Sequence, residues 1–152
     1  MISKVPEKAI QLYDADYFQW IEETLTKLKA SQFSEVDWEN LIEEIEDMGR
    51  SEKRAIYNNL KILLLHLLKY RYQKEKRSKS WRSSIREHRQ RLYRAFKESP
   101  SLTRYFESII DESYEDARGL ASDETGLDID KFPKECPFST EEILDMDFLG
   151  EQ

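Results

Sequence analysis

Apolar residues recur at three- and four-residue steps along most of this chain, which is the spacing of one face of an α-helix. Short polar residues that can cap a helix precede these stripes. Together the two signals predict helices over residues 14–30, 37–49, 51–73, 78–97, 101–118 and 139–146. The pattern therefore predicts an all-α fold, a bundle of about five main helices with a short last helix.

The predicted helix boundaries rest on residues that cap or stop helices. The N-cap candidates are Asp14, Asp37, Ser51, Ser78 or Ser80, Ser99 or Ser101, and Ser139. Ser139 is followed three residues later by Glu142, which predicts a capping box. Gly49 and Gly119 are predicted to end the helices that precede them.

Two of the predicted helices differ in how much of their surface is apolar. On the helix over residues 37–49, one face carries Trp38, Leu41, Ile42, Ile45 and Met48, and we expect this face to be buried. The helix over residues 51–73 is apolar nearly all round in its middle, from Leu60 to Leu68. A helix of that kind is expected at the centre of the fold.

The remaining segments have no helical periodicity. Residues 1–12 are predicted to be a lead-in, and residues 120–138, with Gly126, Pro133 and Pro137, an irregular strap over the bundle. The length of 152 residues suits one domain, so we expect a single helical domain over residues 1–152.

Composition narrows the class of protein further. The chain is 36% charged and has only four glycines and four prolines, as expected for helices with solvated faces. Its single cysteine, Cys136, excludes an internal disulfide and any multi-cysteine zinc site, which favours a reducing cytoplasm. The longest apolar run is interrupted by Lys61 and His66, so we expect no membrane partner. Standard metal-ligand and catalytic motifs are also missing, and we expect no metal and no cofactor.

The net charge of −7 conceals a segregation along the chain. Residues 50–97 hold 16 Lys/Arg and 3 Asp/Glu, a net of +13, between two acidic arms. The preceding arm, residues 1–49, has 4 basic and 12 acidic residues, and the following arm, residues 98–152, has 4 and 16. A basic block of this kind can bind phosphates, or its own acidic arms can neutralise it.

Aromatic residues interleave with the cations in residues 69–97, a combination that suits phosphates and stacked bases. The predicted nucleic-acid contacts are Arg71, Lys74, Arg77, Lys79, Trp81, Arg82, Arg86 and Arg89. A protein partner or a homo-oligomer, in which the basic helix of one chain meets an acidic arm of another, is the alternative.

His66 lies inside the leucine run and is the first candidate for chemistry. The simplest interpretation is a core histidine that donates a hydrogen bond to a carboxylate or a backbone carbonyl. The functional alternative is a hydrolase or nuclease in which His66 acts as a general base with Glu44 or Glu46. Arg82 and His88, five residues apart, also resemble the Arg-x(4 to 6)-His motif of the helical nuclease domains called HEPN, a spacing that arises easily in an arginine-rich segment.

Seven segments, in order, resemble the domain-of-unknown-function family 29, small helical bacterial proteins abundant in cyanobacteria. They are YDADYFQWIEETLTKLKA at Tyr13, ENLIEEIEDMGRSEKR at Glu39, LLLHLLKYRYQ at Leu63, RSKSWRSSIREHR at Arg77, PSL at Pro100, ETGL at Glu124 and FPKECPFSTEEILDMDF at Phe132. The resemblance runs from about Leu12 to Leu149.

The resemblance implies an all-α single domain but no activity, substrate or cofactor. It adds weight to the matched positions Glu43, Glu44, Glu46, Gly49, His66, Trp81, Arg82 and Arg89. His88 replaces the glutamine usual at its position in the family, which counts against the Arg82–His88 nuclease interpretation. We therefore expect a binding or interaction module with a basic helical surface, and the sequence leaves open whether the protein is an enzyme.

Overall fold

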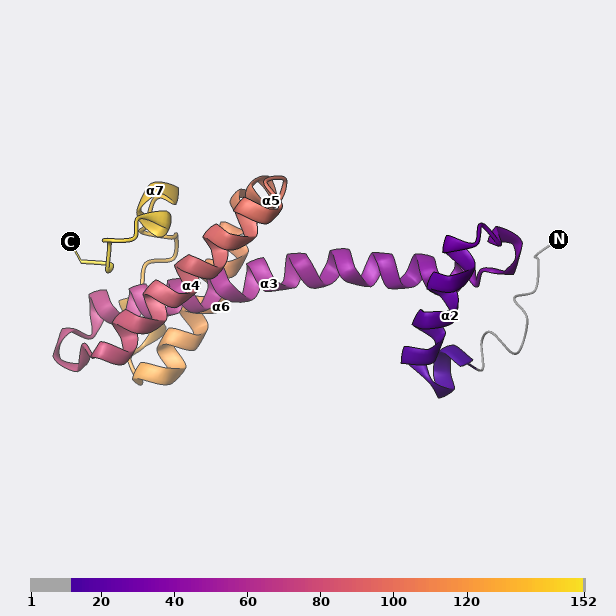
Figure 1. Cartoon of the computed structure of the whole chain (residues 1–152). Coiled ribbons are helices and arrows are strands. Elements are labelled where there is room, and N and C mark those ends of the chain that lie inside the picture. The colour runs from indigo at the N-terminus through magenta and orange to yellow at the C-terminus, as the bar shows by residue number, and fades with distance from the viewer. Residues whose placement is uncertain (1–11, 152) are drawn as a thin grey trace. The chain divides into compact units, whose positions relative to one another are not determined.

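The computed structural model describes residues 12–151 and is all-α (Figure 1). Its helices are α2 (Tyr17–Lys29), α3 (Trp38–Tyr72), α4 (Lys79–Glu98), α5 (Leu102–Ser108), α6 (Ile110–Thr125) and α7 (Thr140–Leu144), with short 3-10 turns η1 (Phe33–Glu35), η2 (Lys74–Lys76) and η3 (Ile129–Lys131). No strand occurs within residues 12–151. The prediction of an all-α fold with five main helices and a short last one is confirmed.

Contacts divide the chain into two compact units, of which unit 1 ends at Ser51 and unit 2 begins at Glu52. In unit 1, Asp16 rather than Asp14 caps α2, because its Oδ1 accepts a hydrogen bond from the Gln19 amide at 3.0 Å. Trp20 is buried and donates through Nε1 to Asp37 at 3.2 Å. Asp37 also accepts from the Asn40 amide at the start of α3, as predicted.

The predictions that Gly49 ends one helix and that Ser51 caps the next are wrong. α3 continues through both positions without interruption for 35 residues. A glycine ends a helix when it adopts a left-handed conformation, which Gly49 does not. Within a regular helix its cost is about 1 kcal/mol relative to alanine, which the hydrogen bonds of a long helix outweigh.

The apolar face of α3 in unit 1 is exposed, which corrects the prediction that it is buried. Trp38, Ile42, Ile45 and Met48 are each between 44% and 59% exposed. Helical periodicity shows that these side chains share a face, but it does not show that another element covers that face.

Unit 2 contains the main hydrophobic core, and the second part of α3 supplies more of it than any other element. The leucines at 60, 63, 64, 67 and 68 are completely buried, as expected for a central helix. The core is completed by Ile85 and Leu92 from α4, Phe106 from α5, Tyr114, Ala117 and Ala121 from α6, and Phe132, Phe138 and Ile143 from the C-terminal segment. Figure 1 shows α4 and α6 beside this part of α3.

The predicted helix over residues 101–118 is two helices. Ile109, at φ −110° and ψ 8°, separates α5 from α6, and α6 continues through Gly119. The helix ends at Gly126, whose φ of +75° is the left-handed conformation that favours glycine. The irregular strap is therefore shorter than predicted, because its first residues belong to α6.

The C-terminal segment has a local cap at the start of its helix and a close approach to α3 near its end. Ser139 and Glu142 form the predicted capping box at the start of α7, which ends at Leu144. Gly150 has φ +88°, and a Cβ there would lie 2.6 Å from the Leu67 carbonyl oxygen. A glycine is therefore required for this close approach to α3.

The predicted lead-in, residues 1–12, lies almost entirely outside the described residues, as only Leu12 is included. In the part of the chain that the structure describes, no helix is both long enough and apolar enough to span a membrane.

Candidate nucleic-acid interface

The outer face of α4 carries a row of cations. Ser78 caps this helix by accepting a hydrogen bond from the Trp81 amide at 3.2 Å, which confirms its predicted start. At 100° per residue, five exposed cations lie within an arc of about 120°. They are Lys79, Arg82, Arg86, Arg94 and Lys97. The opposite side of α4 enters the core through Ile85 and Leu92.

None of these five cations forms an ion pair or a side-chain hydrogen bond with another residue between 12 and 151. The ion pair of α4 in that range joins Arg91 to Glu87 within the helix. The only ion pair found there between the basic block and the acidic C-terminal arm is Lys69 with Glu124, at 3.2 Å. The row on α4 is thus a cationic surface without neutralising partners among the described residues.

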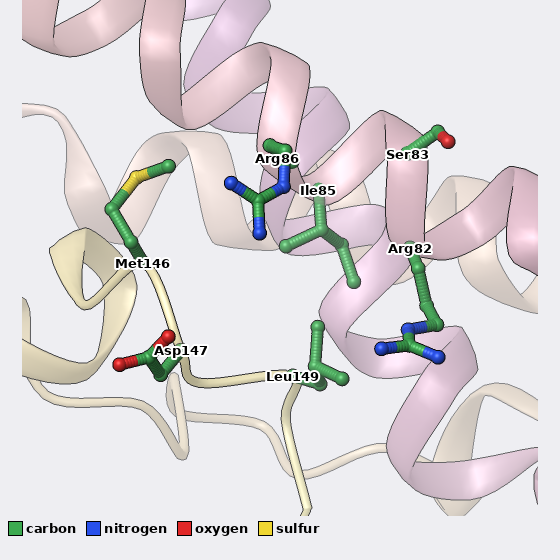
Figure 2. A pocket seen from close by; sticks show the side chains of 7 residues that line it. All are labelled: Arg82, Ser83, Ile85, Arg86, Met146, Asp147 and Leu149. Atoms are coloured by element: carbon green, nitrogen blue, oxygen red, sulfur yellow. The ribbon is translucent and has the colours of Figure 1, made fainter.

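Two of the five cations line a pocket between α4 and the C-terminal segment. Figure 2 shows Arg82 and Arg86 extending from α4, with Asp147 and Leu149 on the facing segment. Ser83, Ile85 and Met146 complete the lining. The pocket is about 210 Å³, below the size typical of cofactor and drug sites. The lining thus combines two guanidinium groups with one carboxylate.

Three of the predicted nucleic-acid contacts have partners inside unit 2. Arg71 donates through Nε to the Gly150 carbonyl at 2.5 Å, and its guanidinium lies 4.7 Å from the centre of the Phe138 ring. Arg77 donates to the Tyr70 carbonyl at 2.7 Å. Trp81 is half-buried, and the Lys69 ammonium lies 4.9 Å from its ring centre. The contacts of these three side chains stabilise unit 2.

The prediction that Arg89 contacts nucleic acid is wrong, because its side chain is 0% exposed. Its Nε donates to the Ile143 carbonyl at 2.7 Å and its Nη2 to the Glu142 carbonyl at 3.1 Å. Burial lowers the pKa of the guanidinium to about 10, so it remains charged at neutral pH. The charge fastens α7 to α4. Of the predicted contacts, Lys74, Lys79, Arg82 and Arg86 remain exposed.

The aromatic residues of the basic block are mostly committed to the fold. Tyr70 is buried, and the Tyr72 ring packs edge-on against Phe132 with 5.5 Å between centres. Tyr93 is exposed, and its hydroxyl donates to the Leu144 carbonyl. The exposed groups of the basic block are therefore mainly cations, which can bind phosphates. Few of its aromatic rings are free to stack on bases.

His66 is half-buried in unit 2, and its Nδ1 lies 2.9 Å from the Ile62 carbonyl oxygen. A carbonyl oxygen can only accept, so Nδ1 carries the proton. Ser84 Oγ lies 3.4 Å from Nδ1 of His66 and equally far from Nδ1 of His88. Burial lowers the pKa of His66, so its neutral form dominates at pH 7. The backbone partner matches the simplest interpretation of this residue.

Glu44 and Glu46 belong to unit 1 and have other partners. Glu44 accepts hydrogen bonds from the hydroxyls of Tyr13 and Tyr17, and that contact raises the pKa of both phenols. Glu46 lies 3.6 Å from Arg50. His66 belongs to unit 2. The hydrolase alternative stays a prediction.

Two parts of the arrangement were missed from sequence. Arg94 and Lys97 extend the cationic row, and their helical spacing from Arg86 was the available signal. The aromatic cluster of Tyr13, Tyr17 and Trp20 was also missed, although its steps of four and three place the rings on one face.

A family model described as "Domain of unknown function DUF29" matches residues 12–149. No curated protein and no solved structure matches the chain.

Proposed function

Because this chain belongs to the family DUF29, whose description assigns no activity, we propose a function from the site itself: a module that binds the phosphate backbone of nucleic acids through the outer face of α4. The observation that carries the proposal is the row Lys79, Arg82, Arg86, Arg94 and Lys97. All five are exposed, and none has an intramolecular partner among residues 12–151. Cations left free in this way are available for an anionic ligand.

The length of the row suits a polyanion. From Lys79 to Lys97 the helix rises about 27 Å, at 1.5 Å per residue. Double-stranded DNA carries one charge per about 1.7 Å of its axis, so several phosphates fall within this length.

The proposal is for binding that does not depend on base sequence. Phosphate contacts position a protein but carry no sequence information. Affinities of this kind are weak at physiological salt, with a Kd of about 10⁻⁴–10⁻⁶ M. The net charge of −7 repels a nucleic acid at long range, and this repulsion is screened least at low salt. The attraction between the row of cations and the phosphates must therefore outweigh it.

The test is binding of the full chain to fluorescein-labelled single-stranded and duplex oligonucleotides, measured by anisotropy between 20 and 200 mM NaCl. Five phosphate contacts predict a slope of log K against log salt of about −4.5 for duplex and −3.5 for single strands. The triple variant Arg82→Glu, Arg86→Glu, Arg94→Glu should weaken binding more than tenfold, since each reversal removes one contact and adds repulsion.

The matched control is Arg104→Glu, Lys131→Glu, Lys134→Glu, which changes the net charge equally at exposed cations outside α4. It should weaken binding far less than the α4 triple variant. Equal losses would show an effect of net charge alone. Either that result or no binding at 20 mM NaCl would remove the proposal.

A further inference from the structure

Unit 1 exposes a set of large apolar side chains that is independent of the basic face of α4. On α2 these are Tyr17, Phe18, Ile21 and Leu25, on η1 Phe33, and on α3 Trp38, Ile42, Ile45 and Met48. We call these nine residues the unit 1 apolar face. Their exposed fractions run from 38% to 68%, so none of them is more than partly covered.

The residues follow helical stripes on both elements. On α3, Trp38, Ile42, Ile45 and Met48 lie within an arc of about 120°, at 100° per residue. On α2, Phe18, Ile21 and Leu25 lie within about 60°. Stripes of this width are the pattern of helices that pack against another element. Here the stripes are present, and no other described element of unit 1 buries them.

The area of the face is that of a stable interface. A large side chain has roughly 200 Å² to bury. Nine such side chains, each about half exposed, present on the order of 900 Å² in total over α2, η1 and α3. A standard protein interface buries about 800 Å² on each partner. One copy of the face therefore supplies one side of such an interface.

The described residues of unit 1 bury few apolar side chains. Its buried apolar side chains among the described residues are Trp20 and Val36. Chains of about 40 residues usually need a metal, a disulfide or oligomerisation to be stable, because they bury too little surface. The only cysteine, Cys136, lies in unit 2, and no group of three metal-ligating residues was found in the described residues. Association with a second copy is one way for this unit to bury more apolar surface.

We propose that the unit 1 apolar face binds the same face of a second copy of the chain, giving a two-fold symmetric dimer. Aromatic residues and methionine, enriched in interface cores, form much of the face. A two-fold dimer brings the same face of each copy together, and apolar stripes that meet in this way place no like charges opposite each other. This proposal does not depend on nucleic-acid binding by α4.

Charge distinguishes this dimer from one in which the basic helix meets an acidic arm. Residues 12–51 hold 3 basic and 11 acidic residues, so the rims of the two faces repel each other. Salt screens repulsion between exposed charges and strengthens apolar association. The dimer should hold or tighten from 50 to 500 mM NaCl, whereas an interface between opposite charges weakens.

The experiment is sedimentation velocity of the full chain from 1 to 200 µM at both salt concentrations. We expect a species of twice 18.2 kDa that becomes more populated as the concentration rises. The variant Ile42→Glu, Ile45→Glu should raise the dimer Kd at least tenfold. Ile42→Leu, Ile45→Leu keeps the apolar surface and should keep the dimer. Far-UV circular dichroism checks that each variant is helical.

Ile129→Glu is the control for a glutamate at an exposed isoleucine outside unit 1, and it adds one negative charge where the test variant adds two. It should leave the dimer unchanged. Phe18→Gln tests the face independently from α2 and should weaken the dimer. A monomer at 200 µM would overturn the proposal, as would a dimer that salt dissociates or that the Glu and Gln variants leave intact.

Discussion

At the scale of single residues, Arg89 is a charged side chain that is completely buried. Its Nε and Nη2 donate to two consecutive carbonyls of α7, and no part of the side chain reaches solvent. A neighbouring arginine on the same helix, Arg91, is exposed and pairs with Glu87. The two differ in position on the helix and therefore in role.

Replacing Arg89 should destabilise the fold, whereas replacing Arg91 should not. Arg89→Met removes two charged hydrogen bonds, at a cost of about 2–4 kcal/mol. The Ile143 carbonyl loses its side-chain donor, whereas the Glu142 carbonyl still accepts from the Asp145 amide at 3.2 Å. Arg91→Met breaks an exposed pair worth about 0.5 kcal/mol or less. Urea unfolding followed by circular dichroism measures both. Similar losses in the two variants would contradict the structural role of Arg89.

His66 should make stability depend on pH. Burial lowers its pKa in the folded state below the value of about 6.5 expected for the unfolded chain. Between the two pKa values the unfolded chain binds more protons, so stability falls as the pH drops below about 6.5. Ser84, His88, Lys69 and Glu124 are the groups that face it.

The measurement is urea unfolding of the wild type and of His66→Gln at pH 8.5, 7.5 and 5.5. The wild type should lose more stability than the variant between pH 7.5 and 5.5, because glutamine does not titrate. Between pH 8.5 and 7.5 the two should change in parallel. Identical pH profiles throughout would show that His66 does not titrate in this window.

At the scale of elements, Gly49 was predicted to end a helix and does not, whereas Gly126 does end one. Gly49 lies inside α3, and a Cβ there would meet nothing within 4 Å. Gly126 ends α6 with φ +75°. The local sequence around a glycine does not distinguish these situations, because both glycines follow an amphipathic helical stretch.

Alanine substitution separates the two positions. Gly49→Ala should stabilise the helix by about 0.5–1 kcal/mol, because alanine loses less backbone entropy. Gly126→Ala should destabilise by about 1–2 kcal/mol, since a Cβ is unfavourable in the left-handed region. Thermal melts followed at 222 nm measure both changes. A destabilising Gly49→Ala would mean that α3 is interrupted there, as the sequence suggested.

At the scale of the whole molecule, charge and apolar surface are divided between different parts of the chain. Unit 1 carries the acidic rim and the apolar face, and unit 2 carries the main core and the basic face of α4. The two proposed interactions therefore respond oppositely to salt. Phosphate binding weakens as salt rises, whereas apolar association does not.

Much of this fold and part of its site followed from sequence. Helical periodicity placed the leucine-rich centre of α3, Ser78 and Ser139 placed helix starts, and the charge count located the basic block. These features are local, because a helix and its caps depend on residues within about four positions of one another.

Tertiary structure alone decided which members of each pattern face the core. Arg89 and Arg86 are alike in sequence, yet packing of α7 buries the first and leaves the second exposed. The stripe of Trp38 and Ile45 has the periodicity of a buried face, yet it is exposed. Sequence determines which side chains share a face, whereas burial depends on segments distant in the chain that cover it or leave it open.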